Sequence, residues 1–406
     1  MKYEKIIQFI QEGWDKTVRF NPTDVTPEGE DTLLALPYPY TVPCQDGYFQ
    51  EMYYWDTYFT NKGLLASGRT ELAKNNCSNL LYMANKFGFV LNGNRERYKL
   101  GSQPPYLSLM TYDVYQKTGD KAWLKDAYDS LLKEYEFWQT QRLAPNGLNR
   151  YDTLARGAMC STYVPYVRSR TRLPLEGDEE YIGRCYRAEG ESGWDFTWRF
   201  HGKCIQYNPV DLNSNLYAYE RLFGFYEKEL GISARNWAAV AEKRKQLMDK
   251  YLYDAEKGYY TDYNFIDGTL SDVLSCASFQ PYFTGVSSDA EGAKRVLAGL
   301  KTPYGLVATD YKDGYFQWGY PNGWAPLHYV AVTALDRCGL TAEASSVAAA
   351  YCETVFRCFN QSGHLFEKYN MQNGTSETLD EYELPHMLGW SAGVFLALLP
   401  YLQSAK

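Results

Sequence analysis

The sequence predicts an all-α fold built from pairs of antiparallel helices joined by short turns. Apolar side chains recur at helical spacing, as at Leu107, Met110 and Val114, and this pattern stops at Gly119. It resumes after Asp120, whose side chain suits a helix N-cap. Such pairs recur along the chain, whereas the β-prone runs are short. We therefore expect roughly a dozen helices arranged as hairpins.

The individual elements follow from the same pattern, taken in order. Helices are predicted over 3–18, 52–67, 70–87, 107–118, 120–138, 209–229, 232–254, 289–300, 323–338, 341–358 and 388–403. The region 143–207 lacks a sustained pattern, so we expect it to be mostly loop. The run from Gly258 to Phe265 is predicted to form small hairpins rather than a sheet. The helical pairs do not repeat at a fixed length.

Size and composition favour one large domain over residues 1–406. A chain of 406 residues with 45% hydrophobic content can bury a large core, and no Pro/Gly/Ser linker or charged run marks a boundary. The net charge of -8 argues against a nucleic-acid partner. The 38 tyrosines and 10 tryptophans suit contact with a carbohydrate, although they can equally fill the core.

Further features bear on location and on bound groups. The N-terminal stretch MKYEKIIQFIQEGWDK has no uninterrupted apolar run of the kind that a secretory signal needs, and no window is apolar enough for a membrane span. The nine cysteines, without CxxC spacing, suggest reduced core thiols. The four histidines lack ligand spacing. We therefore expect a cytoplasmic protein with no membrane contact, no metal and no cofactor.

The segment Glu191–Phe196 (ESGWDF) is the strongest functional signal. It sets Asp195 beside a glycine and between two aromatic residues, Trp194 and Phe196. Aromatic faces pack on the apolar faces of pyranose rings, and partial desolvation raises a carboxyl pKa toward the value that a proton donor needs. A buried Trp-Asp pair can also be a purely structural hydrogen bond.

Three other segments combine aromatic and polar side chains in the same way. They are QEMYYWDTYF at 50–59, NGNR followed by SQPP between 92 and 105, and QWGYPNGWAP at 317–326. Amides and carboxylates bind vicinal hydroxyls, and rings stack on sugars. Each segment alone could be an aromatic-rich helix start that serves the core. Together, the four segments predict a single polar-aromatic pocket for a small carbohydrate, at one end of the fold.

These motifs resemble those of the trehalases of glycoside hydrolase family 37. The likeness runs from about Pro43 to Val394 and keeps the order YYWD, NGNR…SQPP, ESGWDF, PVDLN, QWxYPNGWAP and EKY. It implies an (α/α)6 toroid, in which six inner helices surround a pocket lined by the loops at one end. It also implies hydrolysis of a small α-glucoside with inversion of the anomeric carbon.

The resemblance implies two catalytic carboxyls and a set of sugar contacts. Asp195 matches the family's general acid, and Glu367 of the EKY segment matches its general base. A surface ion pair with Lys368 is the alternative for Glu367, and helix capping is the alternative for Asp56 and Asn92. The implied sugar-binding residues are Phe49, Trp55, Asp56, Asn92, Gln103, Trp194, Trp318 and Glu381.

Some positions depart from the family pattern. Tyr48 and Gly101 stand where trehalases have arginines, and Gly319 replaces the aspartate of QWD. An arginine expected ahead of ESGWDF corresponds to Arg170 or Arg172. We therefore expect trehalose to be a weak substrate. The alternatives are hydrolysis of another α-glycoside, such as glucosylglycerate or mannosylglycerate, and a degenerate family member that only binds sugar.

Overall fold

Six helices form a closed inner ring in the computed structural model, which describes residues 2–171, 175–314, 316–378 and 385–403. Going around the ring, each helix packs on the next, and the last packs along the first. The six are α2 (Tyr54–Ala66), α4 (Leu107–Thr118), α9 (Val210–Leu230), α11 (Gln280–Thr284), α13 (Ala325–Arg337) and α15 (Gly389–Leu398). This arrangement confirms the predicted toroid.

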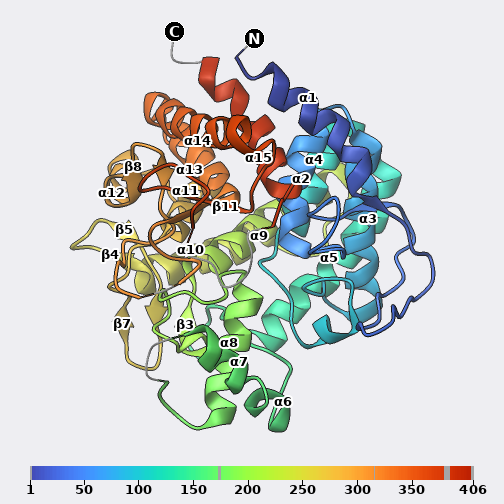
Figure 1. Ribbon diagram of the computed structural model, residues 1–406. Coiled ribbons are helices and arrows are strands. Elements are labelled where there is room, and N and C mark those ends of the chain that lie inside the picture. Colours follow the sequence, from blue (N-terminus) through green and yellow to red (C-terminus); the bar gives the residue numbers. More distant parts are fainter. Residues whose placement is uncertain (1, 172–174, 315, 379–384, 404–406) are drawn as a thin grey trace.

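A second layer of helices covers the ring (Figure 1). Each outer helix follows or flanks an inner one, as α3 and α5 do beside α4. The layer comprises α1 (Glu4–Gly13), α3 (Thr70–Phe87), α5 (Lys121–Gln141), α10 (Trp237–Tyr251), α12 (Ala290–Leu300) and α14 (Thr341–Ser362). Helix α1 packs on the end of the chain, because the ring of Tyr3 lies edge-on to Phe356 of α14 and Phe395 of α15, at 5.0 and 5.6 Å.

Burial distinguishes the two layers. Helix α15 is buried on all sides, in keeping with its apolar sequence GWSAGVFLAL. Outer helices such as α12 bury one stripe and expose the other face. Local signals fix the boundaries, since Asp120 accepts a hydrogen bond from the Trp123 backbone N–H at 3.0 Å and so caps α5 as predicted.

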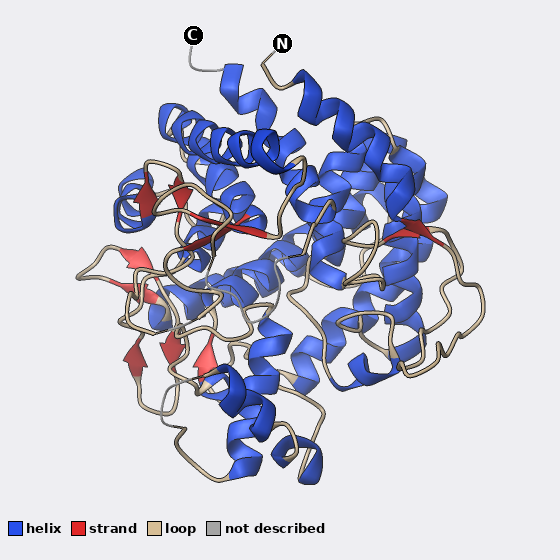
Figure 2. Ribbon diagram, viewed as in Figure 1, coloured by secondary structure: helices blue, strands red, loops and turns tan. Residues whose placement is uncertain are grey.

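The strands are short and antiparallel (Figure 2). They are β1 (Val18–Arg19), β2 (Tyr40–Thr41), β3 (Tyr207–Asn208), β4 (Tyr253–Asp254), β5 (Tyr259–Tyr260), β6 (Tyr263–Asn264), β7 (Thr269–Leu270), β8 (Lys301–Thr302), β9 (Gly305–Leu306), β10 (Asn322–Trp324) and β11 (Lys368–Asn370). The predicted hairpins around Gly258–Phe265 are present as β4–β5 and β6–β7, but β6 also pairs with β3, so part of this run lies in a three-stranded sheet, contrary to the prediction. The pair β10–β11, which lies among the helices near the centre of Figure 2, brings together two of the sequence motifs, with Trp324 opposite Lys368.

The prediction for 143–207 was wrong. This region contains α6 (Ala158–Ser161), α7 (Val164–Arg170) and α8 (Glu179–Ser192). Helix α8 carries two glycines in its interior, which weaken the helical signal in the sequence. Gly183 allows α8 to pack closely on α6, because an ideal Cβ at this position would collide with the carbonyl of Cys160. Tertiary contact therefore overrides propensity in this helix.

The inner helices begin at the same end of the ring. Tyr54 starts α2 beside Asn92, whose carbonyl accepts the Tyr54 backbone N–H at 3.0 Å. Helix α13 begins directly after β10, and Trp390 lies in the first turn of α15. None of the described helices is both long and apolar enough to span a bilayer.

Candidate active site

A pocket of about 260 Å³ opens at the end of the ring where the inner helices begin, and all four polar-aromatic motifs contribute to it. Its lining consists of Phe49, Tyr53, Trp55, Asp56, Asn92, Tyr98, Gln103, Tyr163, Gly190, Gly193, Asp195, Gln317, Trp318, Trp324, Glu367, Met387 and Trp390. The prediction that the motifs meet at one end is confirmed. Eight of the predicted site residues are in this lining: Phe49, Trp55, Asp56, Asn92, Gln103, Asp195, Trp318 and Glu367.

One predicted residue, Trp194, is not in this lining. Trp194 is buried behind the lining, with its ring 5.3 Å from that of Trp318 and 4.9 Å from the guanidinium carbon of Arg199. It supports the pocket instead of facing it. Glu381 lies outside the described residues, as does Arg172.

Asp195 follows the turn that ends α8. Gly193 closes this helix at φ 71°, and an ideal Cβ there would lie 2.8 Å from the Trp55 ring, so only glycine fits. The Asp195 carboxyl accepts a hydrogen bond at Oδ2 from Nε2 of Gln317, at 3.1 Å. Burial raises the pKa of this carboxyl to about 6, the negative charge of Glu367 adds to the rise, and Lys368 opposes it. The rise predicted from the aromatic setting is confirmed.

Glu367 immediately precedes β11 and is only 4% exposed. Its Oε2 lies 2.8 Å from Nζ of Lys368, which is 0% exposed. The pair is therefore buried and is not the surface ion pair considered from sequence. The Glu367 carbonyl also accepts the indole N–H of Trp390 at 3.1 Å, which fixes the backbone at the start of the strand.

Asp56 lies in the first turn of α2 and is 8% exposed. Burial, with the charges of Glu367 and Asp195 adding to it, raises the pKa of its carboxyl to about 8. The neutral form therefore predominates at pH 7. A neutral carboxylic acid can donate one hydrogen bond and accept another, which suits contact with a sugar hydroxyl.

Asn92 and Gln103 tie neighbouring loops to the helix starts. The Asn92 amide donates to the carbonyls of Ser102 and Gly190, at 3.3 and 3.2 Å. Gln103 accepts the Trp55 backbone N–H at 3.0 Å through Oε1. Tyr53 is the N-cap of α2, so neither Asn92 nor Asp56 takes that position, although the Asp56 carboxyl accepts its own backbone N–H in the first turn of the helix.

A cluster of tryptophan rings forms one side of the pocket. Trp318 stacks on Trp324 with centroids 3.7 Å apart and planes at 3°, and Trp55 lies 5.5 Å from Trp318 and 5.9 Å from Trp390. Trp324 and Trp390 were not predicted as site residues, although Trp324 lies within the quoted motif QWGYPNGWAP. A tryptophan at the start of each late inner helix was the signal that could have found them.

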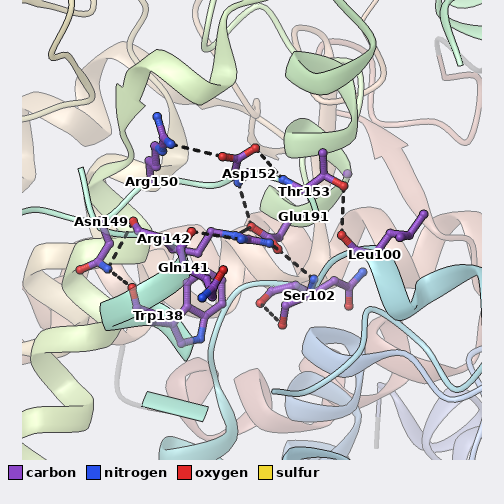
Figure 3. A network of polar contacts seen from close by, with 12 residues as sticks. Leu100, Ser102, Trp138, Gln141, Arg142, Asn149, Arg150, Asp152, Thr153 and Glu191 are labelled. Atoms are coloured by element: carbon purple, nitrogen blue, oxygen red, sulfur yellow. Dashed lines mark hydrogen bonds and ion pairs between the residues drawn. The ribbon is translucent and has the colours of Figure 1, made fainter. Parts of the chain in front are cut away.

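A network of buried charged side chains stabilises the ESGWDF segment. The Glu191 carboxylate accepts two hydrogen bonds from Arg142, both at 2.7 Å, and the backbone N–H groups of Ser102 and Asp152 at 3.0 and 2.9 Å (Figure 3). Asp152 in turn pairs with Arg184 at 2.5 Å. This network holds the loop of Ser102 against the end of α8. Gln103 from that loop and Gly193 and Asp195 after α8 line the pocket.

The positions that depart from the family pattern do not lie in this lining. Tyr48 is 52% exposed. An ideal Cβ on Gly101 would lie 3.6 Å from Oε1 of Glu191, an oxygen that Arg142 already binds. Among the described residues, those that line the pocket include no arginine or lysine, so its surface is formed by carboxyls, amides and rings.

Comparison with known proteins points to one family. The family model described as Trehalase matches residues 1–403. A protein named periplasmic trehalase from Xanthomonas oryzae pv. oryzae is 36% identical over 95% of this chain and 71% of its own length. One of the same name from Pseudomonas aeruginosa is 35% identical over 91% and 72%.

Solved structures agree with this. The neutral trehalase Nth1 of Saccharomyces cerevisiae superposes with a TM-score of 0.79 at 26% identity, covering 98% of this chain and 82% of that one. A mannosylglycerate hydrolase from Thermus thermophilus shares the fold, with a TM-score of 0.62 at 16% identity over 88% and 95%.

The comparisons overturn the predicted cytoplasmic location, because these curated relatives are named periplasmic trehalases. The cysteine argument failed for a physical reason. All nine thiols are free and eight of them are buried. A buried, unpaired thiol can persist in an oxidising compartment as well as in a reducing one.

Proposed function

The chain belongs to the trehalase family of glycoside hydrolases, and we propose that it hydrolyses trehalose or a closely related small α-glucoside with inversion. One observation carries the mechanism. Two carboxyls in the same polar-aromatic pocket have opposite electrostatic surroundings: Asp195 has a raised pKa, while Glu367 is paired with a buried ammonium. Such a difference in surroundings supports the proposal that one carboxyl is the acid and the other is the base of a glycosidase.

Asp195 is the proposed general acid. With a pKa of about 6, a substantial fraction of its carboxyl is protonated in mildly acidic to neutral solution. Protonation of the glycosidic oxygen makes the leaving sugar a neutral alcohol as the bond breaks. Since the acid form is required, kcat/KM falls as the pH rises through about 6 in the free enzyme.

Glu367 is the proposed general base. The ammonium of Lys368 at 2.8 Å stabilises its carboxylate form, in which it can accept a proton from water. The water attacks the anomeric carbon from the face opposite the leaving oxygen. An inverting enzyme needs roughly 6.5–9.5 Å between the two carboxyls to accommodate it.

The remaining lining residues are proposed to hold the reacting sugar. The rings of Trp55, Trp318 and Trp390 offer apolar faces to the pyranose, and Asp56 and Gln103 offer oxygens to its hydroxyls. Asn92 and Phe49 complete the wall on the side of the early loops. Trp194 is proposed to hold the ring of Trp318 in place by packing on it. Contact of Glu381 with the sugar remains a prediction.

Amide substitutions test the two catalytic roles. Asp195→Asn and Glu367→Gln preserve shape but remove proton transfer, so each should lower kcat by about 10³-fold or more while sugar binding changes little. Glu291→Gln, on the exposed first turn of α12, is the matched control and should behave as wild type. Sugar affinity is measured by calorimetry and turnover by glucose release.

The anomer of the first product tests inversion. Proton NMR of the fresh hydrolysate of an α-glucoside should show β-glucose before mutarotation. Net retention, or near-normal turnover by Glu367→Gln, would contradict the assignment of acid and base.

The absence of a cation from the described lining favours a second candidate, hydrolysis of another α-glycoside. An arginine clamp binds more strongly than neutral groups do, so we predict a kcat/KM for trehalose below the ordinary range of ~10⁴ M⁻¹s⁻¹. A hydrolysis screen over trehalose, kojibiose, nigerose, glucosylglycerate and mannosylglycerate identifies the preferred substrate. Efficient turnover of trehalose above that range would show that the neutral lining does not limit it.

A further inference from the structure

A continuous line of polar contacts connects the proposed acid to the proposed base. Nε2 of Gln317 donates to Oδ2 of Asp195 at 3.1 Å. Oε1 of the same amide lies 3.4 Å from Nζ of Lys368, which donates to Oε2 of Glu367 at 2.8 Å. A single amide and a single ammonium therefore stand between the two carboxyls.

The chemistry of these groups fixes the direction of every hydrogen bond in the line. An ammonium has three donors and no acceptor, so only the oxygen of the Gln317 amide can face Lys368. The NH₂ end of the amide must then face Asp195. An NH₂ group has no acceptor to offer, so the Asp195 oxygen that it meets, Oδ2, must act as an acceptor.

We propose that Lys368 and Gln317 are positioning residues that distribute the protons between the two carboxyls. Lys368 keeps Glu367 as a bare carboxylate and, through the Gln317 amide, makes Oδ2 of Asp195 the hydrogen-bond acceptor. The transferable proton of Asp195 is thereby kept off Oδ2, the oxygen that accepts from Gln317. This inference rests on the proposed acid and base, and adds how each receives its protonation state.

Packing holds the line in place. Lys368 is 0% exposed and its ammonium lies 4.8 Å from the centre of the Trp324 ring. The pairing of β10 with β11 sets Lys368 opposite Trp324. Gln317 is also pinned, because its carbonyl accepts the Asn322 amide at 3.0 Å and the Trp324 indole N–H at 3.2 Å.

The other titratable groups that face Glu367 are consistent with this role. Asp56 of α2 approaches it, as do Asp195 from the turn after α8 and the Cys44 thiol, and both Asp56 and Cys44 have pKa values raised mainly by burial and further by the Glu367 charge. At neutral pH the uncharged forms of Asp56 and Cys44 predominate. Of the described groups around Glu367, Lys368 is therefore the cation that offsets its charge.

The pH dependence of kcat/KM separates this role from ordinary structural support. In Lys368→Met the alkaline limb should move to higher pH, because Lys368 no longer lowers the pKa of Asp195. Lys368→Arg, which keeps a donor cation, should restore that limb in part.

Gln317→Leu is the second variant and decides the question if Lys368→Met does not fold. Asp195 then loses a donor to its charged form, so only the alkaline limb should move up while the acidic limb stays in place. Lys294→Met and Gln372→Leu, both at exposed positions, are the matched controls and should leave both limbs unchanged.

Lys368→Met or Gln317→Leu could lower kcat while the pH profile of kcat/KM keeps the limbs of the wild type. That result would mean that these residues give structural support only, and it would overturn the proposal. Asp195→Asn and Glu367→Gln are assayed beside them. If these two amide variants are inactive while the pH limbs of Lys368→Met and Gln317→Leu stay in place, only the proton assignment is contradicted. Their near-normal activity would instead contradict the proposed function.

Discussion

Three carboxyls share one pocket yet differ in how they are used. Asp195 and Asp56 have raised pKa values, to about 6 and about 8, because burial penalises their charged forms. Glu367 is buried as well, but it alone of the three pairs with an ammonium. Their different electrostatic surroundings support the proposed roles of Asp195 as proton donor, Glu367 as proton acceptor and Asp56 as a neutral hydrogen-bonding group.

The raised pKa of Asp56 predicts a cost in stability. Its folded pKa of about 8 exceeds the usual value of 3.8, so folding favours the neutral form. The stabilisation is complete below about pH 4 and is lost as the pH rises toward 8. Asp56→Asn stays neutral, so its urea midpoint should exceed that of wild type at pH 8 and match it near pH 4.

The control for this prediction is Asp126→Asn, at an exposed position on α5, which should show no such pH dependence. An Asp56→Asn protein that is less stable than wild type at pH 8 would mean that the ionised carboxyl is stabilised by a contact that outweighs its burial.

The sequence predicted individual site residues better than their connections. Asp195 and Glu367 stand in recognisable segments, and both line the pocket. The role of Lys368 could not be predicted, because adjacency to Glu367 suggested a solvated pair. Its burial depends on β11 pairing with β10, a contact between segments more than forty positions apart. Such long-range register leaves no mark in local sequence.

At the level of elements, a close contact between two helices closes the ring. Helices α2 and α15 cross at two glycines, where an ideal Cβ on Gly63 would lie 2.5 Å from Cα of Gly393. One on Gly393 would collide with the carbonyl of Phe59. Neither glycine was singled out from sequence, since a glycine inside a helix usually signals weak propensity instead of close packing.

We predict that Gly63→Ala destabilises the protein by about 1–3 kcal/mol, because the added methyl group forces the two backbones apart. Gly224→Ala in α9 is the matched control. Its Cβ would make only ordinary contact with Trp237 at 3.7 Å, so better helix propensity should stabilise it by about 0.5–1 kcal/mol. Urea unfolding measures both. A neutral Gly63→Ala would show that the helices can separate without cost.

For the whole molecule, the toroid followed from the helical pattern and the resemblance together, whereas α8 was missed because its glycines conceal it. A single domain over 1–406 remains a prediction. It is supported by the packing of the first inner helix on the last. Helix α1 crossing α14 and α15 adds a second link between distant parts of the chain.

A single domain should unfold in one cooperative step. Far-UV circular dichroism, which follows the helices, and tryptophan fluorescence, which reports on rings such as those of the pocket, should give the same midpoint in urea. Two separated midpoints would indicate two units that unfold independently.

Closure of the ring also sets an order of events during biosynthesis. Helix α2 leaves the ribosome early, yet the surface that covers it belongs to α15, which is translated near the end of the described chain. Until then the apolar side of α2 has no cover, and Trp390 is missing from the pocket. The nascent chain thus carries Asp195 and Glu367, the two proposed catalytic carboxyls, before its cavity is complete, and the uncovered side of α2 is exposed to solvent in the interval.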